Sequence, residues 1–173
     1  SSSFFACLLM GACVGVLPAE EDADELTIGS TAPTLDIEHW FSLGKGRFSE
    51  VNDFEAGNVY VVEFWATWCG PCISSMPHLV EVQNRHAEDG VQIISISDES
   101  ESKVQAFLKR PVRGAKPQAK SEDDKDGEDD QDAESEPMTY GELTNAYCLT
   151  TDPDRSVYRD YMTAAAQNGI PTS

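Results

Sequence analysis

Cysteine is scarce in this chain, with five among 173 residues. Cys7 and Cys13 belong to an uncharged N-terminal stretch, which leaves Cys69, Cys72 and Cys148 for the remainder of the chain. Three thiols are too few for a disulfide scaffold, and they fall short of the four ligands that a structural zinc site needs. A hydrophobic core must therefore hold the fold, and this length with 40% hydrophobic residues suits a single domain.

Positive charge is scarce as well, because 12 Lys and Arg residues stand against 31 Asp and Glu residues and the net charge is -19. A nucleic-acid backbone or an anionic membrane surface would repel such a chain, so neither is expected as a partner. The acidic residues gather in residues 20–25, within an expected acidic linker over residues 20–31, and in residues 122–136. Residues 114–137 contain almost no apolar side chains, and this composition predicts a disordered acidic insert on the surface.

Histidine is also rare, and no metal-binding pattern emerges. His39, His78 and His86 lie far apart in the sequence, and none is expected to act as a base or a ligand. A calcium loop in the acidic insert is the alternative to test. Aligning Gly127 with the glycine of such a loop places Ala133 where a bidentate Glu is required. The sequence therefore predicts no metal site, with at most diffuse cation binding by the insert.

No hydrophobic run is long enough to be a clear membrane span. Residues 4–19 form an uncharged stretch of 16 residues that resembles the core of a signal peptide. No Lys or Arg precedes Lys45 and the chain does not begin with Met, so we expect residues 1–19 to be a partial signal. Cleavage after Ala19, lipidation of Cys13 in the imperfect lipobox MGAC, and a retained anchor or buried helix stay open. All but the buried helix imply export, to the periplasm or to a membrane anchor facing outside the cytoplasm.

A strand-helix-strand pattern surrounds the two neighbouring cysteines. Residues 59–66 are β-branched and aromatic and predict a buried strand. A helical pattern then starts at Cys72 and ends at Gly90, and residues 91–97 predict a second buried strand. A connection of this length makes the two strands parallel and right-handed, as in a βαβ unit. Upstream, residues 32–46 alternate weakly and predict an N-terminal strand pair or hairpin.

Shorter elements follow the βαβ unit. Ser100 or Ser102 can cap a short helix that ends at Pro111. The stretch AYCLTTD around Cys148 predicts a short strand, and residues 154–169 predict a helix. Cys148 itself is most simply a small buried apolar residue, with a regulatory thiol as the alternative. The fold class is therefore α/β.

The motif FWATWCGPC, residues 64–72, together with Pro77 resembles thioredoxin. The exported setting resembles the TlpA/ResA-like branch of that superfamily, which consists of exported thiol-disulfide oxidoreductases. The resemblance covers residues 32–173 and implies a thioredoxin-like domain over them. It also implies that Pro171, in the sequence GIPT, is a cis-proline facing the two cysteines, with Ile170 on the substrate-facing surface.

The chain departs from the family pattern in two places. Family members continue with two strands and a helix after the cis-proline, so we expect the domain to be incomplete at its C-terminal end. Residues 59–66 would then form a central strand with an unpaired edge. Ser75 stands where many TlpA-like sequences have an acidic residue, which leaves the subfamily open.

A cysteine at a helix start is suited to thiol chemistry. The unsatisfied N–H groups and the positive dipole end of the helix favour a thiolate, so we expect the pKa of Cys69 to lie below the ordinary value of about 8.5. Cys69 is then the attacking sulfur, and Cys72, one turn further, resolves the mixed disulfide by forming a Cys69–Cys72 bridge. Gly70 and Pro71 tighten this ring and, by resemblance, favour a reductant, while Trp68 lines the substrate-facing surface. No metal or organic cofactor is needed.

Glu63 lies inside the apolar strand, six residues before Cys69. It resembles the buried acid that helps deprotonate the resolving cysteine in thioredoxin. Burial would raise its pKa, as a proton shuttle requires. Strand alternation also permits the alternative, a carboxylate turned to solvent.

Three functions remain compatible with the sequence. The first is an exported, monomeric thiol-disulfide oxidoreductase that reduces disulfide-containing protein substrates and is recharged by a membrane electron donor. The second is a thiol peroxidase, or redoxin, on the same fold, which usually relies on a cysteine outside the CxxC pair. The third is a non-catalytic binding module whose acidic insert recruits cationic partners.

Overall fold

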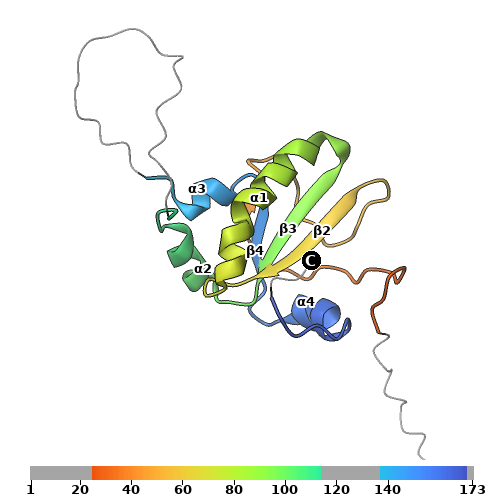
Figure 1. The fold of residues 1–173 in the computed structure, drawn as a ribbon. Helices are drawn as coiled ribbons and strands as arrows, with labels where there is room; N and C mark the ends of the chain where they lie inside the picture. Colours follow the sequence, from red (N-terminus) through yellow and green to blue (C-terminus); the bar gives the residue numbers. More distant parts are fainter. Residues whose placement is uncertain (1–24, 114–136, 171–173) are drawn as a thin grey trace, which may run out of the picture.

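The computed structural model describes residues 25–113 and 137–170 (Figure 1). The expected signal over residues 1–19, almost all of the acidic insert and Pro171 lie outside these residues, so the predictions made for them stay predictions. Within the described ranges, none of the helices combines the length and the apolar character that crossing a membrane requires.

A four-stranded sheet forms the centre of the domain, in the order β1-β4-β3-β2. Its strands are β1 (His39–Leu43), β2 (Val59–Trp65), β3 (Val91–Ser97) and β4 (Cys148–Thr151). β2 and β4 both run parallel to β3, whereas β1 is antiparallel to β4. The predicted βαβ unit is confirmed, because helix α1 (Gly70–His86) connects β2 to β3. Among the described residues β2 lies at an edge of the sheet, as expected.

The prediction of an N-terminal strand pair over residues 32–46 is wrong, because this region supplies β1 alone. The backbone has positive φ at Gly44, Lys45 and Gly46, so the chain turns sharply after β1. The carbonyl of Leu43 accepts a hydrogen bond from the amide of Gly46 at 3.1 Å and closes this turn. The chain does not return alongside β1, which pairs instead with β4, far along the sequence.

Helices cover both faces of the sheet (Figure 1). One face carries α1, α2 (Glu101–Leu108) and α3 (Tyr140–Thr144); the other carries α4 (Ser156–Tyr158) and the π-helical turn Arg159–Thr163. The short helix before Pro111 is confirmed as α2, with Ser100 at its N-cap. The helix predicted over residues 154–169 is confirmed only in part, since its helical portion is shorter and partly π-helical.

Alternating strand residues build a separate core on each face of the sheet. Trp65 of β2 and Ile93 of β3 pack with Cys72 on the face that carries α1. Phe64 packs on the opposite face with Val157 and other residues around α4. Cys69 and Cys72 therefore pack in the first core, whereas Phe64, at the start of the motif, packs in the second.

Gln83 of α1 is fully buried and binds the backbone of β3 with both ends of its amide. Its Nε2 donates to the carbonyl of Val91 at 2.8 Å, and its Oε1 accepts from the N–H of Ile93 at 2.8 Å. β4 pairs with β3 only from Ile94 onward. Before this residue, the side-chain amide of Gln83 makes the hydrogen bonds that a neighbouring strand would otherwise make. These two bonds fix α1, and with it the cysteine motif, on the sheet.

Glu99, in the loop after β3, holds the loop that leads from β2 to the cysteines. It is 8% exposed and accepts two hydrogen bonds from Thr67, one from the amide at 2.6 Å and one from the hydroxyl at 3.0 Å. Lys103 forms an ion pair with the same carboxylate. Burial alone would raise the pKa of Glu99, but the hydrogen bonds from Lys103 and Thr67 outweigh it and lower that pKa below 4.5.

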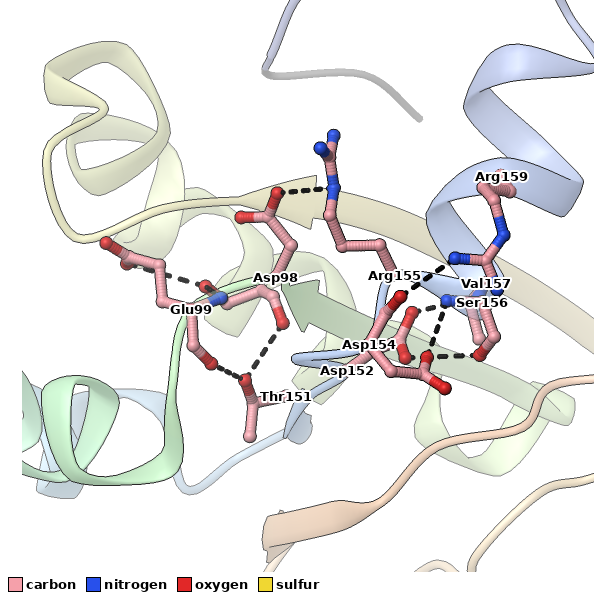
Figure 2. Close-up of polar contacts among 10 residues, drawn as sticks. Asp98, Glu99, Thr151, Asp152, Asp154, Arg155, Ser156, Val157 and Arg159 are labelled. Carbon is pink, nitrogen blue, oxygen red and sulfur yellow. Dashed lines mark hydrogen bonds and ion pairs between the residues drawn. The ribbon is translucent and has the colours of Figure 1, made fainter.

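Figure 2 shows how the loop after β3 is tied to the loop after β4. The hydroxyl of Thr151 donates to the main-chain oxygen of Glu99, and Asp98 pairs with Arg155 at 3.1 Å. Asp152 accepts the amide of Val157 at 2.9 Å at the start of α4. The carboxyl ends of the parallel strands therefore carry one connected set of loops, and the loop before Cys69 is attached to it through Glu99.

Removing the amide of Gln83 should destabilise the protein. We expect Gln83→Met to lower the free energy of unfolding by about 2–4 kcal/mol, because the N–H of Ile93 and the carbonyl of Val91 lose their buried partners. Urea denaturation measures this loss. The control is Gln105→Met on α2, where the exposed amide bonds only to Glu101. Equal losses for the two variants would contradict the assigned role of Gln83.

The Glu99 carboxylate should make stability depend on pH. Its folded pKa lies below its ordinary value of 4.5, so its contribution is present above pH 4.5 and is lost as the pH falls through the folded pKa. We expect Glu99→Gln to cost about 1–3 kcal/mol at pH 7 and progressively less in acid. Denaturation at several pH values, with the exposed Glu88→Gln as the control, checks this. If the loss of stability caused by Glu99→Gln is as large in acid as at pH 7, the charge of Glu99 does not contribute to stability.

Candidate redox site

The two cysteines lie where β2 ends and α1 begins, at the carboxyl edge of the parallel strands. After Trp65 the chain makes a short turn, in which the amide of Cys69 donates to the carbonyl of Ala66 at 3.0 Å. Cys69 has extended backbone angles and is the N-cap residue of α1. The predicted position of Cys69 at a helix start is thus confirmed, and Pro71 lies in the first turn, where its missing N–H costs nothing.

Cys69 and Cys72 are joined by a disulfide, with their Cα atoms 5.3 Å apart. The amide of Cys72 donates to the sulfur of Cys69 at 3.2 Å, so this sulfur accepts one of the amides that the helix start leaves unpaired. Cys69 is 4% exposed and Cys72 is fully buried. The arrangement gives the two sulfurs unequal access to a substrate, and the outer one is the sulfur that the amide would stabilise as a thiolate.

The residues next to the disulfide form an exposed apolar rim. Trp68 is 69% exposed, and Gly70 and Pro71 are also exposed. Ile170 comes from the other end of the chain and lines a cavity of about 350 Å³ together with Trp68. Trp68, Gly70 and Pro71 thus adjoin the cysteines in the chain, and Ile170 meets Trp68 at this cavity. Pro171, which follows Ile170, lies outside the described residues, and the substrate-facing role of these residues stays a prediction.

Glu63 is 4% exposed on β2, so the alternative of a solvent-facing carboxylate is wrong. It points to the face that carries α1, because its alternate neighbours Val61 and Trp65 pack in the same core as Cys72. The hydroxyl of Ser95, its partner in the β2–β3 register, donates to its carboxylate. Burial raises the pKa of Glu63, and the hydrogen bond from Ser95 only partly opposes this.

Tyr147 adds a buried phenol to the same core, and no pattern in the sequence indicates it. The side chain is fully buried, and its hydroxyl has no hydrogen-bond partner among the described residues. Burial, with a smaller contribution from the nearby charge of Glu63, raises the pKa of Tyr147. The phenol therefore stays protonated and adds no charge of its own beneath the disulfide.

Cys148 lies on the opposite face of the sheet from the disulfide and is fully buried. Its sulfur accepts a hydrogen bond from Gln92 at 3.3 Å. Burial raises the pKa of Cys148 to about 11, so this thiol stays protonated and unreactive at neutral pH. The prediction of a small buried residue is confirmed.

The described part of the chain contains one group of side chains that could hold a metal ion. Ligand atoms of Glu38, Asp152 and Asp154 lie within 4.8 Å of one another. Burial and the nearby charge of Asp152 raise the pKa of Glu38 to about 7, and Asp152 already accepts hydrogen bonds at the start of α4. Asp152 is thus already engaged by hydrogen bonds within the protein. The expected absence of a metal site stays a prediction.

The three histidines lie away from the disulfide's immediate surroundings and make surface contacts. His39 lies 3.5 Å from Glu101, and His86 lies 2.9 Å from Asp89. His78 follows Pro77 on α1 and is largely exposed, 3.9 Å from Glu81. These pairs are ordinary surface contacts, and none of them adds a base to the redox site.

Two named relatives are similar to this chain over about half of its length. Thiol-disulfide oxidoreductase ResA of a Bacillus cereus strain is 33% identical over 90 residues, which are 51% of this chain and 49% of the relative. Protein FixW of Rhizobium leguminosarum is 29% identical over 80 residues, which are 46% of this chain and 34% of the relative. The chain spans about half the length of the ResA relatives that it matches.

Two solved structures are also similar. A Chlorobium tepidum structure described as a thiol:disulfide interchange protein DsbE is 17% identical, with a TM-score of 0.43, over 82% of this chain and 75% of the other. A secreted Mycobacterium tuberculosis disulfide oxidoreductase, described as homologous to E. coli DsbE, is 16% identical, with a TM-score of 0.38, over 62% of this chain and 55% of the other.

The family model described as the AhpC/TSA family matches residues 28–172, a span that includes the βαβ unit, both cysteines of the disulfide and β4. This match covers most of the chain and confirms the thioredoxin-like family that the cysteine motif predicted. The chain belongs to the AhpC/TSA family.

Proposed function

We propose that this protein is an exported thiol-disulfide oxidoreductase that reduces disulfide bonds in polypeptide substrates. The observation that carries the proposal is the Cys69–Cys72 disulfide at the N-cap of α1, with its exposed rim. The name of the ResA relatives, thiol-disulfide oxidoreductase, supports it. Export rests on the uncharged stretch in residues 4–19.

The reaction begins with the reduced protein. The thiolate of Cys69 attacks one sulfur of the substrate disulfide; the substrate S–S bond breaks, and the departing sulfur leaves as a thiolate that takes up a proton. The thiolate of Cys72 then attacks the sulfur of Cys69 and releases the second substrate sulfur, which is also protonated. Two electrons have then passed from the protein to the substrate, and the protein carries the Cys69–Cys72 disulfide.

Each step has a residue that favours it. The amide of Cys72, which donates to the sulfur of Cys69, stabilises negative charge on that sulfur in the first step. In the second step the buried Cys72 must lose its proton, and Glu63 on the same face of the sheet is the acid-base group that would accept it. The thiols supply the electrons, so no metal or organic cofactor is required.

The cycle requires a source of electrons. A dithiol donor must reduce the Cys69–Cys72 disulfide by the same exchange in reverse. The location outside the cytoplasm points to a donor at the membrane, and the protein acts as a monomer in this scheme.

A thiol peroxidase remains the second candidate because of the family to which the chain belongs. Such an enzyme would need a reactive cysteine outside the CxxC pair. Cys148 is the free cysteine of the described residues, and it is buried with a raised pKa. This observation favours disulfide reduction over peroxide reduction.

Loss of the attacking sulfur should abolish turnover. In an insulin-reduction assay with dithiothreitol as the electron source, we expect the full-length protein to be active and Cys69→Ser to fall to background. Cys148→Ser is the control and should keep its activity, since that thiol lies on the opposite face of the sheet. Peroxide consumption without disulfide reduction would support the peroxidase instead, and an inactive wild type would support a binding module.

Glu63→Gln should stabilise the protein and slow the second step of the reaction, in which Cys72 attacks the mixed disulfide. Because burial raises the pKa of Glu63, the folded state loses stability relative to the unfolded state as the pH rises above 4.5. The variant should therefore be more stable than wild type above that pH. Release of the mixed disulfide should slow at least about tenfold, because Cys72 loses its base. Rapid-quench kinetics and urea denaturation measure the two effects.

Glu50→Gln, at an exposed position, is the matched control for this experiment and should change neither quantity. A Glu63→Gln variant that resolves the mixed disulfide at the wild-type rate would remove Glu63 from the mechanism. A variant that loses both stability and rate would make Glu63 a structural residue.

A further inference from the structure

A groove of about 860 Å³ begins beside the disulfide and is not used in the mechanism above. Trp68 and Gly70, the two neighbours of Cys69, line the end of the groove that is nearest to the sulfurs. From there it passes between α1 and residues 110–113, which follow α2. A substrate held in this groove would have its chain within reach of the redox centre.

Apolar side chains line part of the groove, beside polar ones such as Thr67 and Ser74. Ile73 and Pro77 contribute from α1, Phe107 from α2 and Leu143 from α3, and Val112 completes this surface. These side chains come from three separate helices and a loop, so the groove is a feature of the tertiary fold. Apolar side chains of a bound polypeptide would gain burial here.

Backbone hydrogen bonds fix the outer wall of the groove. The amide of Val112 donates to the carbonyl of Met138 at 2.8 Å, and the amide of Tyr140 donates to the carbonyl of Arg110 at 2.9 Å. Pro111 and Thr139 form a bridge between these two bonds. The wall is therefore a short antiparallel ladder, and the positions of the side chains on it are well defined.

Charge in the groove is opposite to that of the chain as a whole. Arg110 and Arg113 line it, and no Asp or Glu of the described residues does. Neither arginine forms an ion pair with a carboxylate of the described residues; Arg110 lies 5.7 Å from the centre of the Phe107 ring. Two exposed guanidinium groups beside an apolar surface are suited to carboxylates on a bound chain.

We propose that this groove binds the polypeptide segment next to the substrate's disulfide and that Arg110 and Arg113 select segments that carry Asp or Glu side chains. The inference rests on the proposed reduction of disulfides and names the class of substrate for it. The net charge of -19 does not prevent such binding, because charges farther away than about 8 Å are largely screened at physiological ionic strength. Charge complementarity within the groove then decides the preference.

Two synthetic peptides test the proposal with the full-length, reduced protein. They share one intramolecular disulfide, and its flanks carry Glu residues in one peptide and Lys residues in the other. We expect the Glu peptide to oxidise the wild-type protein faster, measured as the second-order rate of Cys69–Cys72 formation. In the variant Arg110→Gln/Arg113→Gln, the ratio of the two rates should fall about threefold to tenfold, and high salt should lower the wild-type ratio similarly.

The variant Lys45→Gln/Arg85→Gln removes the same two charges at other exposed positions and should keep the wild-type ratio. Because the ratio is taken within one protein sample, partial unfolding of a variant does not change it. An unchanged ratio in the groove variant, or an equal fall in the control variant, overturns the proposal. Equal acceleration of both peptides in the groove variant also overturns it, since the acidic residues 122–136 of the chain itself would then be the occupant.

The peptide experiment distinguishes a failure of the proposed function from a failure of the groove proposal. If neither peptide oxidises the wild-type protein, disulfide exchange itself is excluded, and the groove proposal falls with it. If both peptides oxidise it at the same rate, the exchange reaction stands, and only the selection by Arg110 and Arg113 is refuted.

Discussion

The hydrogen bond from the amide of Cys72 to the sulfur of Cys69 is the contact on which the site depends. It exists because β2 ends one short turn before α1 begins, which places Cys69 at the N-cap and Cys72 one turn inside the helix. An N-cap side chain normally accepts such an amide through oxygen, and here sulfur does so. The same few atoms therefore begin the helix and prepare the outer sulfur to carry negative charge.

The register of β2 against β3 decides which groups lie beneath this contact. Glu63 pairs with Ser95 on the face of α1, while Phe64 pairs with Ile96 on the other face. A shift of one residue would turn Glu63 into the second core and put a phenyl ring below Cys72. Burial of this carboxylate raises the pKa of Glu63, and the same register places the acid on the face of the sheet that carries the two cysteines.

Local patterns in the sequence were sufficient to predict the βαβ unit, α2 and the position of both cysteines. Hydrophobic periodicity and the residue preferences at helix N-termini depend on residues close together in the sequence. The hairpin prediction failed because three consecutive residues with positive φ turn the chain away after β1. Glu99 and Gln83 were not identified because their partners, Thr67 and the backbone of β3, are set by tertiary packing. No local pattern marks such residues among the other acids and amides.

The disulfide and the proposed substrate groove come from different parts of this fold. The two cysteines lie at the carboxyl edge of the parallel strands, where β2 ends and α1 begins, whereas the groove beside them is also lined by α2, α3 and residues 110–113. Ligands of open α/β sheets bind at this edge, because the loops that end there converge. Arg110 and Arg113 lie outside the βαβ unit, so their replacement would change which chains dock without moving either sulfur. A common thiol exchange could thus serve different substrates in proteins that differ only in these loops.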